Sequence, residues 1–130
     1  MQNENVKLKT RNIDTKQRAF SLALRVIKLV DLLPKDPAAQ IIGKQLLRSA
    51  TSIGANIVEA QASASKKEYV NFFSIALKSA NETKFWLGLL RDSKKANAEE
   101  TNKLIAEAKE IANIIGASVI TLKENIKNKR

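Results

Sequence analysis

Apolar residues recur through most of the chain at steps of three and four, the spacing that places them on one face of an α-helix. This pattern predicts four helices, near residues 14–33, 37–62, 66–95 and 98–127. Residues that favour helix starts stand at each beginning: Asp14, Asp36 before Pro37, Ser65 with Glu68, and Asn97 with Glu100. Because the connections are short, neighbouring helices must run antiparallel. The predicted fold is an all-α, up-down-up-down four-helix bundle.

The same pattern divides the chain into three parts. Residues 1–13 lack periodicity and are predicted to form a flexible N-terminal tail, followed by the bundle domain at 14–127 and a basic C-terminal end at 128–130. No segment reaches the roughly 20 apolar residues that a membrane-spanning helix needs, and no signal peptide is visible. A cytoplasmic protein without a membrane partner is therefore expected.

The third predicted helix is apolar on two sides. Phe85 and Leu89, one turn apart, point nearly opposite to its inward stripe, and Ile75 and Trp86 lie on the flank. A helix inside a monomeric four-helix bundle needs only one apolar face. The second face predicts a contact between subunits of a homo-oligomer, and a wide core within one monomer is the alternative.

A polar stripe follows the edge of the second predicted helix. It consists of Arg48, Ser52, Asn56 and Glu59, at steps of four, four and three. We interpret it as a structural polar seam, in which a buried Arg48 pairs with Glu82 on the third helix or with Glu59 of a neighbouring subunit. Contact with a ligand or with RNA is the alternative.

Composition restricts the chemistry more than it restricts the fold. Only 5% of the residues are aromatic while 44% are hydrophobic, so the core must be mostly Leu, Ile, Val and Ala. The chain has no cysteine and no histidine, which excludes disulfides, thiolate zinc sites and a Ser–His catalytic pair. We therefore expect no catalytic residue, metal site or cofactor, and a protein that is not an enzyme.

The net charge of +10 is compatible with binding to a polyanion. Two groups of basic residues are candidate nucleic-acid contacts: Arg18, Arg25 and Lys28 on the first helix, and Lys123, Lys127, Lys129 and Arg130 at the end of the chain. No aromatic residues interleave with these charges, so binding should be directed at phosphates rather than bases. A solvated basic surface without a ligand is the alternative.

One motif points to a family. Arg48-Ser-x-x-Ser52-Ile-x-x-Asn56-Ile-x-Glu59-Ala60 resembles the signature of the 23S rRNA intervening-sequence proteins, also called four helix bundle proteins. Downstream residues agree with it: Ser65, Glu68 and Tyr69, the run from Ile75 to Glu82, and Trp86, Leu87 and Leu90. The similarity covers roughly residues 19–126. The family often has Glu-Gly where this chain has Glu59-Ala60.

The resemblance implies properties that the composition does not. Members of this family are all-α bundles that assemble as ring-like homopentamers, and some are encoded inside insertions in large-subunit rRNA genes. A related protein, the accessory variability determinant of diversity-generating retroelements, is a basic pentamer that works with a reverse transcriptase and RNA. The resemblance therefore implies a homopentamer, with RNA or DNA and a reverse transcriptase or other protein as candidate partners.

Two functions are compatible with the sequence. The first is a non-enzymatic, oligomeric accessory factor that binds the phosphate backbone of RNA or DNA. The second is an oligomeric protein-interaction scaffold whose positive charge has no specific nucleic-acid role.

Overall fold

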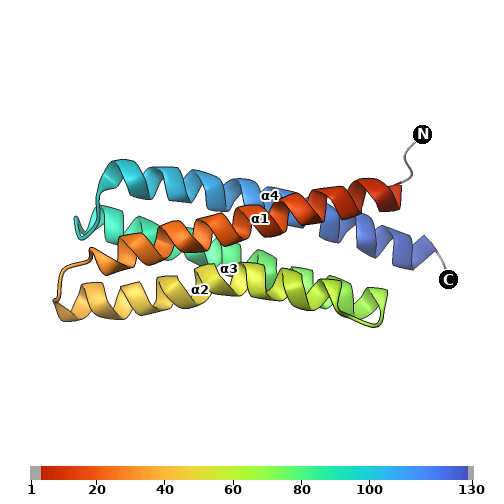
Figure 1. Ribbon diagram of the computed structural model, residues 1–130, viewed down its shortest axis with the longest axis horizontal. Coiled ribbons are helices and arrows are strands. Elements are labelled where there is room, and N and C mark those ends of the chain that lie inside the picture. The colour runs from red at the N-terminus through yellow and green to blue at the C-terminus, as the bar shows by residue number, and fades with distance from the viewer. Residues whose placement is uncertain (1–3, 129–130) are drawn as a thin grey trace.

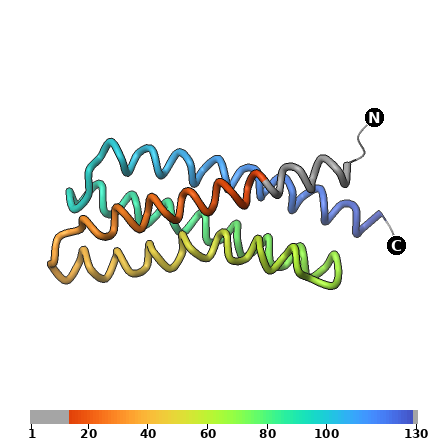
Figure 2. The backbone as a smooth tube through the Cα atoms, viewed as in Figure 1, coloured from red at the N-terminus to blue at the C-terminus, as the bar shows by residue number. Residues whose placement is uncertain are grey.

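Four long helices run alternately up and down and pack side by side (Figure 1). The computed structural model describes the backbone of residues 4–128 and the side chains of residues 14–128 (Figure 2). The helices are α1 (Glu4–Asp31), α2 (Pro37–Gln61), α3 (Lys66–Asp92) and α4 (Ala98–Asn128). Each helix packs against the next in sequence, and α4 packs back against α1. The predicted all-α, up-down-up-down bundle is confirmed.

Three of the predicted helix starts are marked by capping hydrogen bonds. The capping side chain accepts a bond from the amide three residues further on: Asp36 Oδ1 from Ala39 N at 2.9 Å, Ser65 Oγ from Glu68 N at 3.2 Å, and Asn97 Oδ1 from Glu100 N at 2.9 Å. The bond from Ala39, followed by that from the Lys95 ammonium group, lowers the pKa of Asp36. These caps satisfy amides that have no partner inside their own helices.

The first helix starts earlier than its sequence pattern indicates. We expected it to begin at Asp14, but α1 is helical from Glu4, so Asp14 lies inside it and does not cap it. No proline or glycine stands between these two residues to stop a helix. The other predicted boundaries differ by three residues or fewer, the largest difference being the end of α3 at Asp92 instead of Lys95.

The core lies along the bundle axis and consists of aliphatic residues, with Phe73 as the largest fully buried side chain. Gly43 of α2 leaves room for Leu33, which lies in the connection that follows α1. A Cβ atom on Gly43 would lie 2.8 Å from Cδ1 of Leu33. Near the middle of the α1–α2 pair, a Cβ atom on Gly54 would lie 3.6 Å from that of Ala19. None of the helices in the described part of the chain is long and apolar enough to cross a membrane.

A matched pair of leucine substitutions tests the position of the core. Leu87 is fully buried, whereas Leu32 is 85% exposed. Leu87→Ala should lower the free energy of unfolding by about 2–5 kcal/mol, because it removes buried surface and leaves a cavity. Leu32→Ala should change it by less than about 0.5 kcal/mol. Urea denaturation of both variants measures the difference, and equal losses would contradict this core.

Candidate nucleic-acid interface

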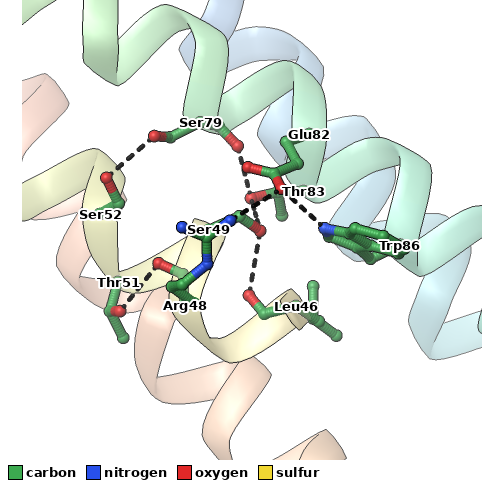
Figure 3. Close-up of polar contacts among 9 residues, drawn as sticks. All are labelled: Leu46, Arg48, Ser49, Thr51, Ser52, Ser79, Glu82, Thr83 and Trp86. Carbon is green, nitrogen blue, oxygen red and sulfur yellow. Dashed lines mark hydrogen bonds and ion pairs between the residues drawn. The ribbon is translucent and has the colours of Figure 1, made fainter. Parts of the chain in front are cut away.

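Hydroxyl groups join α2 to α3 at the centre of the bundle (Figure 3). Thr83 Oγ1 donates to Ser49 Oγ at 2.9 Å, and Ser79 Oγ donates to Ser52 Oγ at 2.9 Å. Ser49, Ser79 and Thr83 are buried, and Asn56 Nδ2 extends the network to Ser52 Oγ at 2.9 Å. The sequence pattern identified Ser52 and Asn56 but missed the other three, because single small polar residues on an apolar stripe resemble ordinary core positions.

Arg48 lies at the edge of this seam rather than inside it. Its Nη2 atom is 3.4 Å from Glu82 Oε1, and the same oxygen accepts a 3.2 Å bond from Trp86 Nε1 (Figure 3). The Arg48 side chain is 70% exposed, so the expectation of a buried ion pair is wrong: the side chain is long enough to stay in solvent while it reaches Glu82. Glu59 is exposed, one turn beyond Asn56.

Two of the basic residues expected to contact nucleic acid are engaged with α4. Arg18 Nη2 lies 2.7 Å from Glu107 Oε1, and its Nε donates to the other carboxylate oxygen at 3.0 Å. This bidentate hydrogen bond raises the pKa of Arg18. Arg25 Nη2 lies 3.2 Å from Glu100 Oε1. The face between α1 and α4 is therefore charge-compensated at these two positions, which weakens it as a phosphate-binding surface.

Lys28, the third residue of that set, lines an open pocket of about 670 Å³ at the end of the bundle where two loops meet. Arg25, Lys94 and Lys95 also line it. Lys95 is paired with Asp36 at 3.1 Å, and Arg25 is paired as described above. Lys28 and Lys94 therefore supply the available positive charge of this pocket.

Several lysines lie along the outer seam between α3 and α4, where Arg91 is paired with Asp92 at 2.9 Å. Residues seven apart share a helix face. Two such rows form the seam, which we define by seven positions: Leu77, Lys84 and Arg91 on α3, and Asn102, Lys109, Gly116 and Lys123 on α4. Arg91 Nη1 donates to Asn102 Oδ1 at 2.8 Å, and a Cβ atom on Gly116 would lie 4.0 Å from Leu77. This register places Lys84 directly across from Lys109.

We define the lysine strip as Lys84, Lys109, Lys123 and Lys127. Lys127 follows Lys109 by 18 residues, which is five full helical turns, so it occupies the same angular position. None of the seven seam positions carries an acidic residue. Lys123 and Lys127 were expected to contact nucleic acid. Lys84 and Lys109 were not, because their proximity depends on the register of α3 against α4. The expected contacts Lys129 and Arg130 lie outside the described residues.

Two exposed apolar surfaces lie away from this strip. The ridge consists of Ile75, Phe85 and Leu89 on α3, which are 44%, 59% and 39% exposed. Trp86, expected beside them, is half-buried and packs edge-on against Phe85, with ring centroids 5.1 Å apart.

The groove is an apolar depression of about 720 Å³ between α1 and α2. Its exposed walls are Phe20, Leu24 and Ile27 of α1 and Val58 of α2, and Ala19 and Gly54 line it between them. The sequence pattern did not predict the groove, because it forms between two helices.

Within the part of the chain that the structure describes, no three acidic side chains are grouped so that they could hold a metal ion. The features that the residues bring together are thus a hydroxyl seam, a basic strip and two apolar surfaces.

Comparisons with known proteins agree with the motif. The family model of the 23S rRNA-intervening sequence protein matches residues 11–117. The structure is similar to the crystal structure of a protein of unknown function from the S23 ribosomal protein family of Bacteroides thetaiotaomicron, with 33% sequence identity and a TM-score of 0.78. That match covers 84% of this chain and 97% of the other. No curated protein matches the chain.

Substitutions in the hydroxyl seam should show coupled energies. Thr83→Val removes the donor to Ser49 and should lower the free energy of unfolding by about 1–3 kcal/mol. Ser49→Ala should have a similar effect, and the double variant should lose less than the sum, because the two residues share one bond. Arg48→Ala should cost less than about 1 kcal/mol, since an exposed pair contributes little. Strict additivity in urea denaturation would contradict the coupling.

Proposed function

The chain belongs to the 23S rRNA-intervening sequence protein family, and on that premise we propose that it is a non-enzymatic accessory protein that binds RNA or DNA through the phosphate backbone. The observation that carries the proposal is the lysine strip between α3 and α4. Lys84 and Lys109 lie across from each other, and no acidic residue stands at the seam positions around them. Like charges that lie side by side repel, and a bound polyanion relieves the repulsion.

The dimensions of the strip suit a nucleic-acid backbone. From Lys109 to Lys127 it extends about 27 Å along α4, at 1.5 Å per residue. Phosphates of one duplex strand follow one another every ~3.4 Å along the axis, so the strip spans roughly eight of them. No aromatic residue stands at the seam positions to stack on bases. Recognition is therefore directed at phosphates and tolerates different sequences.

Assembly with copies of itself forms part of the same proposal. A ring-like homo-oligomer, for which the family resemblance implies a pentamer, presents one strip for each subunit. Repetition of a weak contact raises the overall affinity without any new interaction. The charge of +10 per chain adds a long-range attraction for polyanions. A reverse transcriptase or another protein that works on the bound nucleic acid is a candidate partner, and the cytoplasm is the expected location.

Two variants of equal charge change test the strip. Lys84→Gln with Lys109→Gln removes two charges from it, whereas Lys35→Gln with Lys44→Gln removes two exposed charges elsewhere. The strip variant should bind a structured RNA or a DNA duplex more weakly. For duplex DNA, its plot of log affinity against log salt should flatten by about 0.9 for each phosphate that the variant no longer neutralises. The control variant should retain most of the slope.

Two results would contradict this function. Equal effects of the two variants would mean that binding responds to net charge alone and not to the strip. Absence of binding to either nucleic acid by the unmodified protein at low salt would favour the second candidate, an oligomeric protein-interaction scaffold. The exposed apolar groove between α1 and α2 is the observation that keeps this second candidate open.

A further inference from the structure

Most of the exposed large apolar side chains belong to two surfaces. Ten large hydrophobic residues are exposed among those described, and seven of them form the groove walls or the ridge. Scattered apolar residues on a surface need no explanation, but contiguous patches mark sites of interaction. The two surfaces differ in shape, since one is a hollow between helices and the other consists of side chains on a single helix. Phe85 and Leu89 lie one turn apart, and Ile75 lies about 15 Å from Phe85 along α3.

We propose that the ridge of one chain inserts into the groove of the next copy of the same chain, so that the two surfaces form one repeating head-to-tail contact. This inference rests on the homo-oligomer of the proposed function and identifies its interface. A contact between two different surfaces of identical chains cannot be completed by a dimer, because each added chain leaves one groove and one ridge open. Closure requires a ring.

The ridge and the groove lie on adjacent faces of the bundle. Ile75, Glu82 and Leu89 are spaced by seven residues, and Glu82 is paired with Arg48 of α2, so the ridge flanks the face between α2 and α3. The groove lies on the face between α1 and α2. Helix α2 therefore stands at the corner where the two faces meet.

The two surfaces also lie at the same height along the bundle. The approach of Ala19 to Gly54 fixes the register of α1 on α2, and the bond from Thr83 to Ser49 fixes that of α3 on α2. By these registers Phe85 is level with Val26, next to Ile27, and Ile75 is level with Ile57, next to Val58. Rotation about an axis parallel to the helices preserves height, so it brings the ridge of one chain directly to the groove of its neighbour.

Charges beside the two surfaces are complementary. Lys16 lines the groove at its end near Val58. Ser52 bonds to Ser79 of α3. Glu59 lies seven residues after Ser52 and therefore also lies on the face between α2 and α3, as the ridge does. The register places Lys16 level with Ile57, within about 3 Å of the height of Glu59. An ion pair between Lys16 of one chain and Glu59 of the next would therefore border the apolar contact. It would favour the pairing of the groove of one chain with the ridge of another.

The angle between the faces limits the ring size. Adjacent outer faces of a four-helix bundle point about 90° apart. Neighbours of one subunit are separated by about 90° in a ring of four and by about 108° in a ring of five. The arrangement thus favours four or five chains, with α2 toward the centre and α4 outside. The lysine strip, on the far side of the bundle from α2, stays accessible.

A mixing experiment tests this contact. The groove variant carries Phe20→Glu and Leu24→Lys, and the ridge variant carries Phe85→Glu and Leu89→Lys. All four positions are exposed in the single chain, so circular dichroism should show unchanged helix content. At micromolar concentration the unmodified protein should form a ring of four or five chains. Each variant alone should have the 14.4 kDa mass of one chain by native mass spectrometry.

The mixture gives the decisive result. Each groove variant retains an intact ridge and each ridge variant an intact groove, so the two should form a 1:1 heterodimer and nothing larger. A mixture that stays monomeric, a variant that assembles alone through a symmetric contact, or an unmodified protein that is a monomer would each overturn the proposal.

A charge exchange gives a second test that leaves the apolar residues in place. Lys16→Glu should weaken assembly at least several-fold, and addition of Glu59→Lys should restore it. Failure of the second substitution to restore assembly would overturn the assigned order of faces. Nucleic-acid binding is measured separately, by the salt titration of the strip variant, so failure of the ring interface and failure of the proposed function are distinguishable.

Discussion

The close packing of α2 between α1 and α3 is the constraint on which the other features depend. Gly54 packs against Ala19 of α1 on one flank, and serines at 49 and 52 bond to α3 on the other. Small side chains let helices approach closely, and the hydroxyl bonds fix the register of α3, because a shifted helix would leave buried polar groups without partners. Once these registers are set, the positions of the groove, the ridge and the lysine strip follow.

Charge is distributed unevenly around this framework. On the α1–α4 face, glutamates at 100 and 107 pair with the arginines of α1, so that face contributes little net field. On the α3–α4 face the seam positions lack acidic residues, although Arg91 pairs with the neighbouring Asp92 at 2.9 Å. Helix α4 thus separates a face whose arginines are paired with glutamates from a face whose lysines have no acidic residue at the seam positions. In the proposed ring both lie outside, and the apolar faces that meet at α2 are buried between subunits.

Local features of the sequence predicted the helices of the fold well. Contacts between residues far apart in the sequence could not be predicted from it. Periodicity and the caps at Asp36, Ser65 and Asn97 located three helix starts, because both act within one helical turn. The early start of α1 was missed because residues 1–13 lack an apolar stripe and Asp14 resembles an N-cap residue. The pairing of Arg18 joins residues 89 apart in sequence, which no helical pattern reveals. The groove and the pairing of Lys84 with Lys109 likewise depend on how two helices align. The sequence contains these residues but does not reveal that they lie side by side.

The central claim is that assembly and nucleic-acid binding use separate faces of the bundle, and thiol labelling tests it most directly. The chain has no cysteine, so Leu24→Cys in the groove and Lys109→Cys on the strip each provide a single reporter. In the assembled protein, maleimide should react slowly at position 24 and fast at position 109. Addition of RNA should slow the reaction at position 109 without changing that at position 24. Fast labelling at position 24 in the assembled protein, or RNA protection of position 24 instead of 109, would contradict the account.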